Sequence, residues 1–178
     1  LLDFADRSRP SAPPLEIANQ VDSCVDMLSS QVPDNIIIRT EFEKNLPPVS
    51  ILPVHLNQLL LNLVKNGIEA IPEKRGGSIT ISVRCREIGQ RDLDSIKHSN
   101  DLAPGRVVAV DVDDDGKGMD EKILERIFDP FFSTKEAGRG LGLAGAMGIA
   151  MRYGGTIRVT SSPGAGSHFE VWLPPAEA

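Results

Sequence analysis

The chain has 178 residues, 40% of them hydrophobic, which is the composition of one ordinary globular domain and excludes collagen-like and low-complexity classes. Nineteen basic and 25 acidic residues give a formal net charge of −6, which argues against a nucleic-acid partner or contact with an anionic membrane. No apolar run approaches the roughly 18 residues that a membrane-spanning helix needs. The two cysteines, Cys24 and Cys85, fit no metal or redox spacing. We therefore expect a soluble, mildly acidic, intracellular domain with two buried thiols.

The first part of the chain carries two predicted helices. Residues 1–9 read as the end of one helix, because a cluster of prolines at 10–14 stops it. Residues 15–28 have apolar side chains at helical spacing and predict a second helix. The chain starts with Leu1 rather than Met and shows no signal-peptide pattern, so we expect it to be a piece of a longer protein.

Strands and one long helix come next. Residues 36–42 are rich in β-branched side chains and predict a strand, and residues 49–52 are expected to be a short partner strand. Residues 54–71 predict a long helix. Apolar residues alternate over 78–83, which is typical of a strand with one buried face, and residues 107–112 predict a more completely apolar strand.

The rest of the chain completes one sheet with helices. Residues 89–105 are polar and aperiodic and predict an unusually long surface loop. The remaining predicted elements are a short helix (121–128), an irregular loop (129–138), a helix of small residues (141–153) and a closing hairpin (156–160 with 168–173). Helices stand before and between strands that mostly pair as hairpins, so we expect the α+β class, with helices on one face of a sheet.

The long helix has a narrow polar stripe. At about 100° per residue, six polar side chains fall within roughly a quarter of its circumference, and nearly all the others are apolar. The six are His55, Gln58, Asn62, Lys65, Asn66 and Glu69. Most of this helix should therefore be buried, so the stripe faces either water or a bound molecule. Asn62 and Asn66 lie one turn apart and can direct carbonyl oxygens at one point, as Mg²⁺ requires.

Two glycine-rich segments have the chemistry of ligand loops. Residues 114–119, Asp-Asp-Gly-Lys-Gly-Met, follow an apolar strand, so a fixed carboxylate stands beside backbone that a ligand can approach closely. A carboxylate there suits an exocyclic amine such as that of adenine. Residues 138–143 precede the small-residue helix, and free amides at a helix start, with Arg139 beside them, favour a phosphate. Upstream, residues 128–135 pair aromatic side chains with a cationic stretch, as a lid would.

Two of these segments also have other readings. Residues 111–116 imitate the start of a calcium loop, but Lys122 stands where that motif needs Glu, and a strand rather than a helix enters it. Gly140, Gly142 and Gly145 spell a dinucleotide fingerprint, but no strand precedes them and no acid follows at the usual distance. Plain turns are the remaining alternative for each glycine cluster taken alone.

Taken together, five segments resemble the boxes of the catalytic, ATP-binding domain of sensor histidine kinases. They are residues 62–66 (N box), 114–118 (first glycine box), 128–132 (F box), 138–143 (second glycine box) and 164–169 (a weaker last box). The resemblance covers nearly the whole chain. It implies a Bergerat-type two-layer α/β sandwich, in which a mixed, mostly antiparallel sheet packs on about three helices and a flexible lid covers ATP. It also implies that residues 1–10 end a dimerisation helix or form a linker, and that residues 11–178 are the catalytic domain.

The resemblance further implies a set of site residues. Asn62, Asn66, Lys135 and Arg139 are expected in catalysis, with Asn66 on Mg²⁺ and Asn62 beside it. The expected contacts with ATP are Asn62, Lys65, Asn66, Asp114, Gly116, Gly118, Met119, Phe128, Lys135, Gly138, Arg139, Gly140, Leu141, Gly142, Leu143 and Ser167. Gly67 stands where the family usually has Ala, Arg139 where it has Thr or Ser, and residues 89–105 look like an insertion.

One position distinguishes branches of the superfamily. Members that hydrolyse ATP have a Glu where this chain has Asn62, which cannot act as a base. We therefore expect transfer of the γ-phosphoryl group to a histidine rather than hydrolysis. None of His55, His98 and His168 precedes an acid, as the family's acceptor does, so we expect the acceptor in a dimerisation domain upstream of Leu1.

The resemblance also implies partners and a location. They are the dimerisation domain and a response regulator, in the cytoplasm, with a parent protein that is free to be membrane-anchored. Two alternatives stay open: an ATP-driven conformational clamp, as in the chaperone and topoisomerase branches, and a binding module without catalysis that takes either a nucleotide or calcium.

Overall fold

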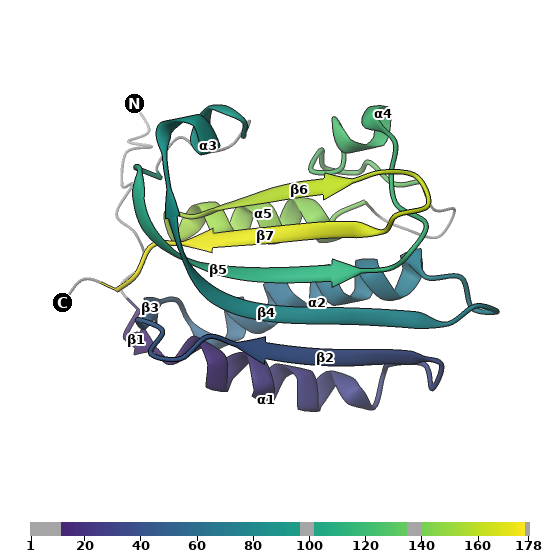
Figure 1. Ribbon diagram of the computed structural model, residues 1–178, viewed down its shortest axis with the longest axis horizontal. Coiled ribbons are helices and arrows are strands. Elements are labelled where there is room, and N and C mark those ends of the chain that lie inside the picture. The colour runs from purple at the N-terminus through teal and green to yellow at the C-terminus, as the bar shows by residue number, and fades with distance from the viewer. Residues whose placement is uncertain (1–11, 97–101, 135–139, 177–178) are drawn as a thin grey trace, which may run out of the picture.

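The computed structural model describes residues 12–96, 102–134 and 140–176, which form two layers (Figure 1). One layer is a five-stranded sheet in the order β2-β4-β5-β7-β6. The strands are β2 (Ile36–Phe42), β4 (Gly77–Ile88), β5 (Gly105–Asp114), β6 (Thr156–Ser161) and β7 (Ser167–Leu173). β2 is parallel to β4 and the other neighbours are antiparallel, which confirms the expected mixed, mostly antiparallel sheet. The helix expected over 1–9 and the boundary at residue 10 lie outside the described residues.

Three helices form the second layer, as predicted. They are α1 (Ile17–Ser29), α2 (Pro53–Ala70) and α5 (Gly142–Arg152), and Figure 1 shows all three behind the sheet. Pro53 begins α2 at a position where its missing N–H has no helical partner to lose. None of the described helices combines the length and the hydrophobicity that crossing a bilayer demands.

The main core lies between these layers. Five α2 side chains are completely buried: Leu56, Leu59, Leu60, Leu63 and Val64. They belong to one cluster with the inward side chains of β4, β5 and β7. Burial of each such side chain stabilises the fold by about 1.5–3 kcal/mol, so α2 is the main hydrophobic element of the domain.

The segment expected as a partner of β2 pairs elsewhere. β3 (Val49–Ser50) is antiparallel to β1 (Pro14–Leu15) and the two form a separate sheet. Leu15 therefore precedes α1 instead of opening it. The partner of β2 is β4, which is longer than the predicted 78–83 because it pairs with β2 at one end and with β5 from Ile79 to Ile88.

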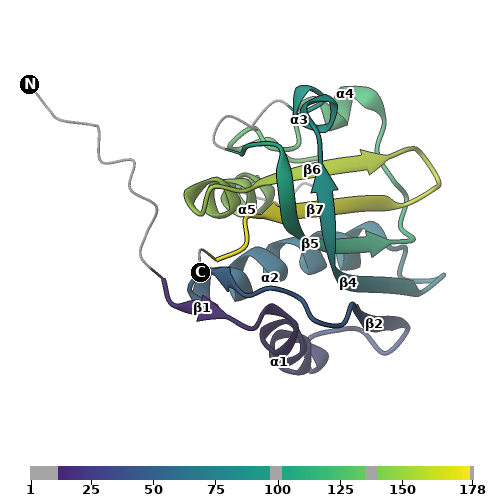
Figure 2. The ribbon, with the colours of Figure 1, turned by 60° about the vertical axis from the view of Figure 1, so that its left-hand side comes forward.

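The expectation of a surface loop over 89–105 is wrong for its described part. This segment contains α3 (Gln90–Asp94), and Leu93 and Leu102 are buried. They join a second core on the face of the sheet opposite the long helices, together with Ile88, Val107, Ala109 and Trp172. Figure 2 shows β4 and β5 bending away from the rest of the sheet toward α3. Two leucines in a polar stretch thus anchor this insertion.

Two smaller expectations also need correction. Cys24 is buried, but Cys85 is only half-buried, because it lies on β4 near the exposed Arg106. α4 (Glu121–Leu124) is shorter than the predicted 121–128. Turns closed by backbone hydrogen bonds between residues three apart follow it, up to Asp129. Asp129 precedes Pro130, a position that disfavours helical backbone.

A glycine inside α5 gives a direct test of local helix energetics. Gly148 is exposed, and a Cβ there would meet no atom within 4 Å. We expect Gly148→Ala to stabilise the domain by about 0.5–1 kcal/mol in urea unfolding, because alanine loses less backbone entropy on entering a helix. Gly155→Ala is the contrasting variant: its Cβ would lie 2.2 Å from the carbonyl oxygen of Trp172, so it should destabilise. Equal effects of the two changes would contradict this account.

Candidate functional site

A cavity of about 740 Å³ lies between α2, the turn after β5, the α4 region and the start of α5. Its volume is in the usual range for a small-molecule site. The lining residues are Asn62, Lys65, Asn66, Glu69, Ala70, Lys117, Gly118, Met119, Ile123, Ile127, Phe132, Ser133, Thr134, Gly140, Leu141, Gly142, Leu143 and Ser167. The apolar members come mainly from the turn, α4 and α5, whereas polar groups come from α2 and from residues 132–134. The cavity therefore suits a ligand with one flat apolar part and one charged part.

The polar stripe of α2 forms one wall. Asn62 and Asn66 are half-buried, whereas Lys65 and Glu69 are exposed at the rim. The Gln58 side-chain amide donates a hydrogen bond of 3.5 Å to Asn62 Oδ1. The stripe thus faces the cavity rather than only solvent, which decides between the two readings of the sequence.

The start of α5 faces the same wall. A Cβ on Gly142 would lie 3.8 Å from Asn62 Oδ1, and one on Gly145 would lie 3.6 Å from Asn62 Nδ2, so the asparagine amide borders the first turn of α5. Among the described residues, no side chain caps this helix start. Its first backbone N–H groups therefore lack helical acceptors and carry the positive end of the helix dipole, which favours a negatively charged group.

The turn after β5 is held in one conformation. Gly118 has φ of +67°, and a Cβ there would lie 1.9 Å from the carbonyl oxygen of Ser162, so only glycine fits. The amide of Lys117 donates to the carbonyl of Ala70 at 2.9 Å, which ties the turn to the end of α2. The amide of Met119 donates to Ser161 Oγ at 2.9 Å. These bonds place the turn between α2 and the β6–β7 hairpin.

Asp114 is the acid of this turn and lies deep in the structure. It is 7% exposed, and its Oδ1 accepts the Gly116 amide at 2.8 Å. Gly116 has no room for a side chain, because a Cβ would lie 2.7 Å from Asp114 Oδ1 and 2.8 Å from Ala70 Cβ. Gly67 of α2 also packs closely against this acid, since a Cβ there would lie 3.2 Å from Asp114 Cβ. Both glycines let the helix and the turn pack directly against the carboxylate.

The ionisation of Asp114 is perturbed by this environment. Burial raises the pKa of its carboxyl above the ordinary value, although amide hydrogen bonds from Gly116 and Ser167 act in the opposite direction. A buried carboxylate that keeps acceptor capacity is suited to a ligand that donates hydrogen bonds.

Most of the predicted site residues meet at this cavity. Its wall includes Asn62, Lys65, Asn66, Gly118, Met119, Gly140, Leu141, Gly142, Leu143 and Ser167. Asp114, Gly116 and Phe128 are not among the residues that line it. Lys135, Gly138 and Arg139 fall outside the described residues.

Several lining residues were not among the predicted site residues. Lys117, Phe132, Ser133 and Thr134 lie inside the segments singled out from the sequence, so the signal was the segment itself rather than the residue type. Ile123 and Ile127 come from the short-helix region, and only the tertiary structure brings their apolar side chains to the cavity.

The acids of the calcium-like segment do not converge. Asp111 pairs with Arg84, Asp113 bonds His168, and Asp114 bonds the Gly116 amide. Successive residues of a strand point to opposite faces, so Asp111 and Asp113 share one face, the sheet face away from the cavity, and Asp114 points to the other. This arrangement does not form a calcium loop.

The histidines lie away from the cavity lining in the described part of the chain. Nδ1 of His55 lies 2.6 Å from the hydroxyl of the buried Tyr153, which ties α2 to the end of α5. His168 lies on β7 as expected, and His98 is outside the described residues.

Comparison with known proteins identifies the family. Residues 51–177 match the family described as histidine kinase-, DNA gyrase B- and HSP90-like ATPase, which is more than half of the chain. The chain belongs to this family. The resemblance inferred from the boxes in the sequence is thereby confirmed.

Named relatives of this ATPase domain are sensor kinases. Sensor kinase CckA of Brucella abortus is 34% identical over 176 residues, covering 98% of this chain and 18% of CckA. The sensory histidine kinase/phosphatase NtrB of Proteus hauseri is 33% identical, covering 89% of this chain and 42% of NtrB. Sensor histidine kinase ZraS of Escherichia coli is 38% identical, covering 83% and 28%. The chain thus spans less than half the length of these curated relatives.

Solved structures agree on the fold. The catalytic domain of histidine kinase ThkA has a TM-score of 0.69 and 26% identity, covering 90% of this chain and 93% of that one. Full-length ShkA in complex with AMPPNP has a TM-score of 0.72 and 23% identity, covering 96% and 33%. The predicted two-layer fold is therefore that of a histidine kinase catalytic domain.

The raised pKa of Asp114 predicts a pH effect on the ligand-free domain. A carboxyl whose pKa is higher in the folded than in the unfolded chain weakens folding at neutral pH, and this penalty disappears as the pH falls through the folded and then the unfolded value. We therefore expect the free energy of unfolding of the wild type, minus that of Asp114→Asn, to increase on acidification. Urea titrations from neutral to acidic pH measure this difference. Gly148→Ala, which changes no titrating group, should show a constant difference, and a constant difference for Asp114→Asn would contradict the prediction.

Proposed function

We propose that this domain binds Mg·ATP and transfers the γ-phosphoryl group to a histidine of a dimerisation domain, from which it passes to an aspartate of a response regulator. The observation that carries this proposal is the cavity wall in which Asn62 and Asn66 stand beside the uncapped start of α5. The names of the relatives support it, since CckA, NtrB and ZraS are sensor kinases. We propose the cytoplasm as the location, where ATP is supplied.

The adenine is assigned to the end of the cavity nearest the acid–glycine turn. Asp114 accepts the exocyclic amine there, because it is a buried carboxylate whose position the glycines at 67 and 116 fix. Met119, Ile123 and Ile127 supply apolar surface for the ring. Phe128 supports this wall from behind.

The triphosphate is assigned to the other end. The first amides of α5 and Gly140 receive the phosphates, and ShkA with AMPPNP is a structural neighbour that binds an ATP analogue. Lys135, Gly138 and Arg139 stay predicted contacts for the same phosphates. Lys65 adds a cation at the rim.

Mg²⁺ fits the donor set at this end. The half-buried carboxamides of Asn62 and Asn66 offer hard oxygen ligands on one face of α2, while phosphate oxygens and water complete the octahedron that Mg²⁺ prefers. When bound, the ion neutralises charge on the phosphates. The carboxamides orient the triphosphate, and the α5 amides stabilise negative charge on it without moving a proton.

The cavity favours transfer over hydrolysis. Glu69 is the only carboxylate on the described lining, and it stands one turn beyond Asn66, next to Ala70 and the acid–glycine turn. It therefore belongs to the adenine end. At the phosphate end Asn62 occupies the place of a base, and an amide does not accept a proton from water at neutral pH.

Phosphoryl transfer tests the function. The chain is mixed with labelled Mg·ATP and a separately folded dimerisation domain of a related kinase that carries the acceptor histidine. We expect label on that histidine, and a loss of at least roughly tenfold in Asn66→Ala, because the ion loses a ligand. No label from folded components, or steady phosphate release by the chain alone at a comparable rate, would contradict the proposal and favour an ATP-driven clamp.

Two neighbouring acids test the orientation of the nucleotide. Asp114→Asn should weaken binding of a non-hydrolysable ATP analogue roughly 10- to 100-fold, because a charged acceptor is worth about 1.5–3 kcal/mol. Asp113→Asn is the matched control, since this side chain lies on the opposite face against His168 and should leave affinity unchanged. Calorimetric titration measures both, with and without Mg²⁺. Equal losses would show that the adenine contact is assigned to the wrong acid.

A further inference from the structure

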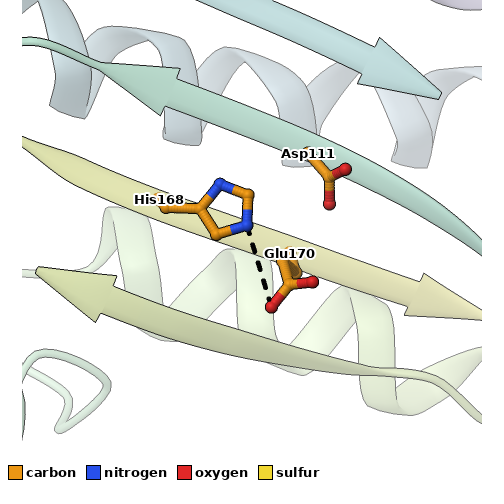
Figure 3. A group of neighbouring side chains, drawn as sticks. All are labelled: Asp111, His168 and Glu170. Carbon is orange, nitrogen blue, oxygen red and sulfur yellow. Dashed lines mark ion pairs between the residues drawn. The ribbon is translucent and has the colours of Figure 1, made fainter. Parts of the chain in front are cut away.

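The sheet face opposite the long helices carries a group of charged side chains outside the nucleotide cavity. We call it the sheet cluster, and its acidic and imidazole members are Asp111 and Asp113 of β5 with His168 and Glu170 of β7. Asp111 pairs in register with Glu170, and Asp113 with His168. Since β5 and β7 are antiparallel neighbours, these four side chains occupy two adjacent rungs on one face. Figure 3 shows three of them turned toward one another.

Asp111 leaves one oxygen without a partner. The residue is completely buried, and its Oδ2 accepts Arg84 Nε at 2.8 Å. Its Oδ1 has no hydrogen-bond partner among the described residues. A buried carboxylate oxygen without a partner is costly to the fold, and it calls for an explanation such as a bound ion.

His168 is oriented by a carboxylate. Its Nδ1 lies 2.5 Å from Asp113 Oδ1, and because a carboxylate only accepts, Nδ1 is the donor. Nε2 is then the atom that faces Glu170, with Oε2 at 3.8 Å. This carboxylate–imidazole arrangement is the one that holds metal-binding histidines in position.

The candidate ligand atoms form a compact group. One ligand atom each of Asp111, His168 and Glu170 lies within 4.8 Å of the other two. A tetrahedral ion with bonds of about 2 Å needs its ligand atoms roughly 3.3 Å apart, so side-chain shifts of about 1 Å close the group around an ion. One nitrogen and two carboxylate oxygens, with water as the fourth ligand, suit Zn²⁺ better than Ca²⁺ or Mg²⁺, which prefer oxygen alone.

We propose that Asp111, His168 and Glu170 form a Zn²⁺ site on this face of the sheet, with Asp113 holding the imidazole. The ion supplies the missing partner of Asp111 Oδ1 and links strands β5 and β7 on the sheet face away from the nucleotide cavity. It lies outside that cavity, so it has a structural rather than a catalytic role.

The surrounding arginines are compatible with this site. Arg84 holds Asp111 Oδ2 and Arg86 bonds Glu170 Oε1, so both use the carboxylate oxygens that the ion does not need. Arg158 Nη1 is 3.6 Å from Glu170 Oε2, beyond ordinary hydrogen-bond distance, and its partly exposed side chain can move toward solvent.

Zinc titration of the full 178-residue chain tests the proposal. Chelator-treated protein is titrated with ZnCl₂ against a chromogenic zinc chelator, and the melting temperature is recorded with and without the ion. We expect one equivalent bound, a higher melting temperature, and loss of this equivalent in His168→Gln and in Asp111→Asn. His55→Gln is the matched control and should keep it, because His55 bonds Tyr153 on the other side of the molecule.

Two further measurements separate loss of the zinc site from loss of folding and identify the imidazole that binds the ion. Binding of the non-hydrolysable ATP analogue shows that each variant is folded, and its persistence alongside lost zinc supports the site independently of the proposed function. In the wild type, nitrogen-15 imidazole spectra should show Zn²⁺ shifting Nε2 of His168 and leaving His55 unchanged. No stoichiometric zinc binding by the wild type, unchanged binding in His168→Gln, or a shift confined to His55 would each overturn the proposal.

Discussion

The burial of α2 is the constraint on which the rest of this domain depends. Its leucine face is enclosed by α1, α5 and the inner face of the sheet, so its single polar stripe is left to border a cavity. The helix position also fixes the turn after β5, because the Lys117 amide bonds the carbonyl of Ala70 at the helix end. Hydrophobic packing therefore sets where the asparagine oxygens and the buried acid stand, and the polar groups contribute chemistry rather than the larger share of the folding energy.

The sequence predicted what local patterns determine. The long helix, the helix of small residues and the closing hairpin follow from periodicity, and the structure contains them with ends shifted by a few residues. The pairing of β3 with β1 and the buried turn around α3 were not predicted, because both depend on contacts between distant segments. Leu93 and Leu102 stand in a mostly polar, aperiodic stretch, so no periodic signal marked them. They become part of a core only by packing with side chains of β4, β5 and β7, Trp172 among them.

The candidate site was more predictable than the fold around it, for a physical reason. Close approach of a ligand and its geometry are local requirements, so short sequence segments reveal them. Examples are glycine at 116 and 118, an acid directly after a strand, and two amides one helical turn apart. The segments did not show which of their side chains line the cavity. Asp114 and Phe128 are not among the lining residues, whereas Ile123 and Ile127 are, because tertiary packing alone decides which side chain meets the cavity.

β5 shows how one strand serves two chemically different faces. Its even-numbered side chains, from Val108 to Val112, fill the main core and end at Asp114, while Asp111 and Asp113 face the sheet cluster. The run of acids that imitates a calcium loop is therefore divided by the two-residue period of the strand, which places consecutive carboxylates on opposite sides of the sheet and limits their mutual repulsion. Each face then balances its charge separately: arginines and His168 compensate the outer acids, whereas backbone amides are the donors found at Asp114. Burial raises the pKa of Asp111 on the outer face and of Asp114 on the inner face alike, so the two faces differ in the donors that they offer and not in the direction of the shift. At Asp114 the donors are single backbone amides, which leave the carboxylate with acceptor capacity for a ligand.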